Sequence, residues 1–300
     1  MALFGANVIY GANYIIAKGI MPHKIGPSAF ILIRVIIGGL LFWFVKQFIK
    51  EKLEKKDILR LAACGFLGVA ANQLLFFHGL NLTSPIDASI IITSVPVMVM
   101  IFSFFILKEK FTSNKLLGLI IGGLGAFFLV WYGKSAEGTS SLLGNLFVFL
   151  NTCSYALYLI FVKPLMKKYK PITVISWVFL FGLVFVLPIG IQDLISTDFS
   201  SFDLSTFFAI GYVVLFTTFL AYLFNIYGLS QVSPTVTSSY AYVQPVVSFI
   251  LVSLYAYLYV QSEYSEDINF LKIVSCILVV IGVYLISKPE KKSTQPQIDN

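Results

Sequence analysis

Long runs of apolar residues recur along the whole chain, and they constrain its fold more than any other feature. A helix that crosses the hydrocarbon core of a bilayer needs about 20 apolar residues, and ten segments reach that length. Helices are expected because a bilayer offers backbone N–H and C=O groups no water, and a helix pairs them internally. The ten predicted helices cover residues 2–20, 28–49, 58–80, 85–107, 113–132, 143–163, 171–192, 204–229, 234–259 and 270–287.

The composition favours the same class of protein. Hydrophobic residues make up 58% of the chain and charged residues 12%, and the mean hydropathy is +0.89, whereas soluble domains carry about a quarter charged residues. The three cysteines each lie alone in a different apolar segment, without the close spacing of metal or redox motifs. The prediction is an all-α polytopic membrane protein with no soluble domain.

One stretch of the chain occurs twice. Gly79, Pro85 and Pro96 follow one another at steps of six and eleven residues, and Gly228, Pro234 and Pro245 repeat those steps 149 residues later. Each copy ends one apolar segment and carries the next to a proline near its middle. A proline inside a helix frees the carbonyl four residues before it, and such paired interruptions in matching halves point to a transport site. Pro96 and Pro245 are therefore the predicted hinges.

The duplication predicts an inverted repeat, because five helices are an odd number and the second copy then enters the membrane from the opposite face. The predicted fold is ten transmembrane helices as two inverted five-helix repeats. The predicted organisation is a first repeat at 1–132, a linker at 133–142, a second repeat at 143–287 and a polar cytoplasmic tail at 288–300.

The basic residues predict the orientation. Cytoplasmic loops of membrane proteins carry an excess of Lys and Arg, and fifteen such residues fall in links on one side of the predicted bundle, whereas the other side has only Lys24, Lys134 and Lys272. We therefore expect a multi-pass protein of the cytoplasmic membrane with both termini cytoplasmic, and we interpret the net charge of +7 as a topology signal rather than a nucleic-acid footprint. The fifteen are Lys46, Lys50, Lys52, Lys55, Lys56, Arg60, Lys108, Lys110, Lys115, Lys167, Lys168, Lys170, Lys288, Lys291 and Lys292.

Several short motifs along the chain match the pattern of one known family. They are Tyr10 to Asn13, Lys18, Pro27, Arg34, Ser84, Pro85, Ala88, Pro96, Glu109 and Gly118 to Gly125, with Lys163, Pro234, Pro245 and Gly282 in the second half. With these residues the chain resembles the EamA-type members of the drug/metabolite transporter superfamily, and the resemblance implies ten helices in two inverted halves and the export of small metabolites. Tyr10 stands where that family usually has Trp, and a longer acidic link around Glu263 and Glu266 displaces the usual Glu after the ninth helix.

Polar side chains inside the apolar segments are the candidate solute-binding residues, because polar groups at membrane depth are costly and mark functional sites. Tyrosine offers an apolar face with one polar group, and amides both donate and accept, so the set suits an amphipathic organic solute. The alternative is that these groups hydrogen-bond between helices and only hold the bundle together. The candidates are Tyr10, Asn13, Asn72, Gln73, Asn151, Tyr155, Tyr158, Tyr222, Asn225, Tyr240 and Gln244.

Four charged residues receive separate hypotheses. Lys18 and Lys163 end the first helix of each half, where they either attract an anionic group to the mouths of the path or extend to the lipid interface. Asp87 is the candidate for proton coupling, with helix capping as its alternative. Arg34 lies seven residues into the second helix, and we interpret it as structural.

The resulting hypothesis is a permease that moves small organic metabolites, such as amino acids or related compounds, mainly outward, by alternating access at a midplane site between the repeats. The alternatives are a non-transporting assembly or binding subunit and a proton-coupled drug/metabolite antiporter. An enzyme is not predicted, because the chain has two histidines and no phosphate-binding glycine loop. The expected partners are a small organic solute and membrane lipid, with no nucleic acid and no cofactor.

Overall fold

The described part of the chain is helical throughout. The computed structural model describes residues 1–21, 24–82, 88, 91–109, 112–131, 141–244, 246–247, 250–251, 254 and 270–287, and these residues contain no strand. The α-helices are α1 (Ala2–Ile20), α2 (Pro27–Lys46), α3 (Ile58–Gly65), α4 (Asn72–Leu82), α6 (Val95–Phe102), α7 (Ser113–Trp131), α8 (Leu142–Val162), α9 (Pro171–Ser196), α10 (Leu204–Tyr212), α11 (Ala221–Gln231), α12 (Pro234–Ser239) and α14 (Phe270–Ser287).

Tighter and wider helical turns join several of these helices into longer ones. The 3-10 segments are η1 (Lys55–Asp57), η4 (Lys163–Lys167), η5 (Phe199–Ser201) and η7 (Tyr240–Tyr242), and the π-helical segments are η2 (Phe66–Ala71), η3 (Ser103–Leu107) and η6 (Val213–Leu220). π turns inside α-helices are rare, and those that occur are often found at functional sites. The continuous helices from Lys55 to Leu82 and from Leu204 to Gln231 each contain one.

Five helices of the described residues are long and apolar enough to cross a membrane. They are Pro27–Lys46, Lys55–Leu82, Leu142–Lys167, Pro171–Ser196 and Leu204–Gln231. Their positions agree with the apolar segments predicted there. The predicted segments 85–107 and 234–259 are described only in part, so the expected total of ten spans stays a prediction.

Proline and short polar side chains fix where the helices begin. Pro27 and Pro171 are the first residues of α2 and α9, where the missing proline N–H costs nothing. Ser233 caps α12, since its hydroxyl accepts from the backbone N–H of Val236. Asp203 caps α10 by accepting from Thr206, and these hydrogen bonds lower the pKa of the Asp203 carboxyl to about 2.

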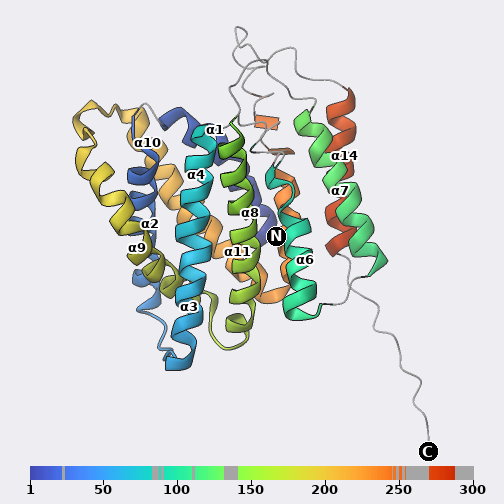
Figure 1. Cartoon of the computed structure of the whole chain (residues 1–300), viewed down its shortest axis with the longest axis horizontal. Coiled ribbons are helices and arrows are strands. Elements are labelled where there is room, and N and C mark those ends of the chain that lie inside the picture. Colours follow the sequence, from blue (N-terminus) through green and yellow to red (C-terminus); the bar gives the residue numbers. More distant parts are fainter. Residues whose placement is uncertain are drawn as a thin grey trace, which may run out of the picture.

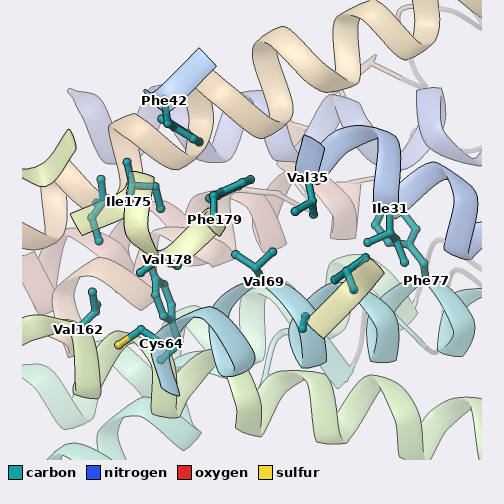
Figure 2. Close-up of a cluster of buried hydrophobic side chains, with 14 of the residues drawn as sticks. Ile31, Val35, Phe42, Cys64, Val69, Phe77, Val162, Ile175, Val178 and Phe179 are labelled. Atoms are coloured by element: carbon teal, nitrogen blue, oxygen red, sulfur yellow. The ribbon is translucent and has the colours of Figure 1, made fainter. Parts of the chain in front are cut away.

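The helices pack in pairs that join distant parts of the sequence. Helix α2 lies against α9, and α7 lies against α14 at the opposite side of the molecule (Figure 1). Helix α4 packs on α8, and α1 packs on α11. The apolar core gathers side chains from α2, α3, η2, α4, α8 and α9, including the fully buried Phe42 and Phe179, whose rings lie 4.8 Å apart (Figure 2).

Polar contacts tie the lysine-rich links together at one end of the bundle. The Lys168 ammonium lies 2.9 Å from Asp57, and this hydrogen bond raises the pKa of Lys168. The Lys163 ammonium donates to the carbonyls of Leu229 and Val232 at the end of α11, each at 2.6 Å. Close to the start of α12, Thr235 donates to the Glu109 carboxylate at 3.2 Å. The links before α3 and after α8 therefore meet at this end, as do the ends of α8 and α11.

Candidate solute site

A central cavity of about 140 Å³ lies where helices from both halves of the chain meet. It is lined by residues of α1, α2, α4, α6, α8, η6, α11, α12 and η7. Eight of the eleven predicted binding residues are in its wall, and three of them lie in α8 and α11. These eight are Tyr10, Asn13, Asn72, Gln73, Asn151, Tyr155, Tyr222 and Gln244.

Two of the other predicted residues lie beside this cavity. Tyr158 and Asn225 line a neighbouring pocket of about 10 Å³, together with Tyr155 and Tyr222. The Asn225 side-chain amide donates to the hydroxyl of Tyr155. Tyr155 is in the lining of both the cavity and this pocket. The third, Tyr240, begins the 3-10 segment η7 and is in the lining of neither space.

Several of the cavity amides also hold helices together. Gln73 Nε2 donates to the Tyr222 hydroxyl at 3.3 Å, which joins α4 to α11. Asn151 Nδ2 donates to the carbonyl of Asn72 at 2.7 Å, which joins α8 to α4. Gln244 Nε2 donates to Asn7 Oδ1 at 2.7 Å. The same side chains therefore line the cavity and form hydrogen bonds between helices. The sequence analysis had treated solute binding and interhelical hydrogen bonding as alternatives.

Aromatic rings give the cavity wall its apolar surface. The rings of Tyr10 and Tyr222 meet edge to face at 6.3 Å between centroids, and Tyr222 meets Phe179 in the same way at 5.2 Å. Phe76 and Phe77 of α4 also line the cavity. Edge-to-face ring pairs are favourable beyond their buried area, so this wall is held in place.

Arg34 of α2 lines the cavity and is 3% exposed. Its Nε donates to the Thr218 hydroxyl at 3.0 Å, and its guanidinium carbon lies 5.0 Å from the centroid of the Phe77 ring. The sequence did not predict that Arg34 belongs to the cavity lining in addition to its contacts with other helices. The signal that could have placed it was its position inside an apolar segment, since charged groups there face the interior of the bundle.

Sequence reasoning also left several polar lining residues out of the candidate set. Asn7 lies three residues before Tyr10 and therefore shares its helix face. Thr237 and Ser238 of α12 and Thr217 of η6 complete the polar wall. Helical spacing from Tyr10 could have identified Asn7, whereas a lone Thr or Ser gives no distinguishing signal.

None of the five residues predicted as hinges, mouth groups or the proton-coupling group is among the described residues that line the cavity. The side chain of Lys18, and all of Asp87 and Pro245, lie outside the described residues. Pro96 is the second residue of α6, and the chain turns at Thr93 and Ser94 immediately before that helix. Lys163 is likewise absent from the cavity lining, since its ammonium donates to the two carbonyls at the end of α11.

Within the described residues, no group of three or more His, Cys, Asp or Glu side chains is arranged to hold a metal ion. His78 instead shares a hydrogen bond of 3.0 Å with the Ser28 hydroxyl. The described lining of the cavity offers hydroxyls, amides, aromatic rings and one guanidinium.

The comparisons with known proteins agree with this arrangement. The model of the EamA-like transporter family matches residues 1–131 and 142–288. The chain belongs to this family. It is thus a multi-pass membrane protein of the drug/metabolite transporter superfamily and a membrane transporter.

Several known proteins are similar to this chain over most of its length. It is 27% identical over 292 residues to YetK, an uncharacterized transporter of Bacillus subtilis (strain 168), covering 97% of this chain and 86% of YetK. It is 26% identical over 262 residues to an uncharacterized transporter of Archaeoglobus fulgidus, covering 87% and 89%. A solved crystal structure shares its fold with a TM-score of 0.75 at 15% identity, over 95% of both chains.

Proposed function

We propose that this EamA-like transporter is a permease of the cytoplasmic membrane that moves small organic metabolites, such as amino acids or related compounds, through its central cavity. The observation that carries the proposal is the cavity itself. It lies between helices from both ends of the sequence, and tyrosines and amides dominate its polar wall. Such a wall can bind both the polar and the apolar parts of an organic solute.

Matching helix contacts in the two halves support an inverted repeat. A Cβ built on Gly38 of α2 would lie 2.7 Å from Thr218 of η6. A Cβ built on Gly182 of α9 would lie 2.6 Å from Val69 of η2. Gly182 is 144 residues after Gly38, and Thr218 is 149 residues after Val69, so both close approaches join equivalent positions.

Three further observations support the same symmetry. The π-helical segments η2 and η6 fall at corresponding places at the 149-residue offset. Gln73 and Tyr222 are separated by the same 149 residues and hydrogen-bond to each other, as residues beside a twofold axis would. The two segments that match the family model have nearly the bounds of the proposed repeats, 1–132 and 143–287.

The proposed cycle is alternating access, in which the halves rock around a midplane site. Lys163 joins the end of α8 to the end of α11 through two hydrogen bonds, and this contact is the proposed closure of one end of the path. Pro96 and Pro245 are the proposed hinges, Lys18 and Lys163 the proposed groups at the two mouths, and Asp87 the proposed residue for any proton coupling. The lysine-rich end is proposed as cytoplasmic, and the family resemblance favours outward movement.

Reconstituted transport tests the proposal. Liposomes containing the full chain are loaded with amino acids, nucleosides and organic cations, and efflux is measured with and without a pH gradient. We expect efflux of one solute class, strongly reduced in Gln244→Ala, whose amide lines the cavity, and unchanged in Gln192→Ala, whose amide is exposed on α9. Absence of flux for every solute from folded protein would contradict the proposal and favour a non-transporting subunit.

A further inference from the structure

Buried hydrogen-bonding atoms without a partner are concentrated in residues that line the central cavity. Within the described residues, seven buried side-chain N or O atoms have no hydrogen-bond partner, and four of them belong to cavity residues. An unsatisfied buried group destabilises the folded state, and more so when it is charged, so a ligand that pairs with several of these atoms would stabilise this region. The four are Asn13 Oδ1, Arg34 Nη1, Gln73 Oε1 and Thr217 Oγ1.

The four atoms differ in what they require. Arg34 Nη1 can only donate, and it belongs to a side chain that stays protonated in proteins. Asn13 Oδ1 and Gln73 Oε1 can only accept. The amide nitrogen of Gln73 already donates to Tyr222, which leaves its oxygen free for a donor. An occupant that satisfies the cavity therefore carries both an acceptor and a donor.

The described lining of the cavity contains one basic side chain, Arg34, and no acidic side chain. Arg34 makes no ion pair with any acid among the described residues. It contacts the Thr218 hydroxyl and the rings of Phe30 and Phe77, and Tyr10 and Tyr222 lie near it in the cavity lining. Aromatic faces and a hydroxyl stabilise a cation without neutralising it. A planar carboxylate fits a guanidinium with two parallel hydrogen bonds, whereas a second cation in this space would be repelled.

We propose that Arg34 binds the anionic group of the transported solute, while the carbonyl oxygens of Asn13 and Gln73 accept from an N–H donor on the same molecule. The substrate class is then a small solute that joins a carboxylate to an amine or amide, and organic cations are excluded. The cavity volume of about 140 Å³ is below the range of about 300–1,000 Å³ of pockets that hold drug-sized ligands, so it suits a small metabolite. This inference rests on the proposed transport function.

The test compares the transport of each amino acid with that of its carboxamide analogue, which lacks the negative charge of the carboxylate. Full-length protein in liposomes is assayed for flux of alanine, serine and glutamine and of their carboxamides, in wild type, Arg34→Met and Arg34→Lys. We expect the wild type to move acids at least tenfold faster than their amides. Arg34→Met should lose this preference, and Arg34→Lys, which keeps the charge without the planar fork, should keep part of it.

The ratio of acid to amide flux separates binding from folding, since a merely structural arginine would lower both rates together. Val178→Met is the matched control, because Val178 occupies the equivalent position 144 residues after Arg34, outside the cavity lining. An unchanged ratio in Arg34→Met, or wild-type flux of amides equal to that of acids, would overturn this inference and leave the transport function standing. No flux of any acid or amide would overturn both.

Discussion

Residues 1–131 and 142–287 make similar helix contacts but line the cavity with partly different side chains. Gly38 meets η6 as Gly182 meets η2, and a π-helical segment lies at corresponding places in both. At the cavity, Tyr10 and Tyr155 lie 145 residues apart and both are in the lining, whereas Val178, 144 residues after Arg34, is outside it. We therefore expect the shared positions to provide packing that both halves need, and the unshared positions to provide the chemistry of solute recognition.

Substitution of the two equivalent glycines should give the largest effects. Gly38→Ala and Gly182→Ala each place a methyl group within 2.7 Å or less of a packed side chain, and overpacking costs about 1–3 kcal/mol. We expect similar losses of thermal stability in detergent for both variants. Gly211→Ala is the control, because a Cβ there meets nothing within 4 Å. Tolerance of one glycine substitution but not the other would break the proposed equivalence.

Loss of the Lys163 contact should open one end of the bundle. Lys163→Met removes two hydrogen bonds from an ammonium to the carbonyls of Leu229 and Val232, and bonds to charged groups contribute about 1.5–3 kcal/mol each. We expect alkylation of a thiol introduced by Ile92→Cys, at the cavity wall, to become about tenfold faster. The exposed neighbour Lys167 supplies the control Lys167→Met. Equal rates in the two variants would exclude Lys163 as a closing contact.

The hydrogen bond between Gln73 and Tyr222 should have a moderate effect. Removal of the hydroxyl in Tyr222→Phe or of the amide in Gln73→Leu should lower stability by about 1 kcal/mol. The double variant should cost less than the sum, since both changes remove the same bond. Strictly additive losses in thermal unfolding would show that the two equivalent positions are not coupled.

The capping residue of α10 should give the smallest effect and shows where the halves differ at their ends. Asp203 accepts from Thr206, whereas its equivalent Glu54, 149 residues earlier, makes no side-chain cap and pairs with Lys56. Because hydrogen bonds lower the pKa of Asp203 to about 2, its stabilising effect is present above the unfolded pKa of about 3.9 and is lost as the pH falls through 2.

Accordingly, Asp203→Ala should lower the melting temperature slightly at pH 6 and more than Glu54→Ala does. The difference between Asp203→Ala and wild type should shrink as the pH is lowered toward 2. A difference that stays constant with pH would mean that the carboxylate charge does not contribute to the cap.

The helical segments were predictable because length and apolarity alone determine which residues can cross a bilayer. Much of the cavity wall was predictable for a related reason, since amides and tyrosines inside apolar segments avoid lipid and face other helices. Spacing of three residues put Tyr10 and Asn13 on one face, and both line the cavity.

The remaining placements depend on neighbours that are distant in sequence. Tyr158 fits into the side pocket because Gly68 leaves room for its ring, and no local pattern reports that contact. Tyr240 begins a 3-10 turn, so the 3.6-residue periodicity used to assign faces fails there. The role of Arg34 depends on Thr218 and Phe77, which come from two other helices.

The central claim is that a solute occupies this cavity and is held there by Arg34. Ile92→Cys, in a chain whose native cysteines are replaced by alanine, places a thiol at the cavity wall without altering its polar groups. Alkylation of that thiol is followed with and without a transported amino acid. The account predicts that the solute slows alkylation and that Arg34→Met abolishes this protection. An alkylation rate unaffected by a saturating concentration of a transported solute would contradict it.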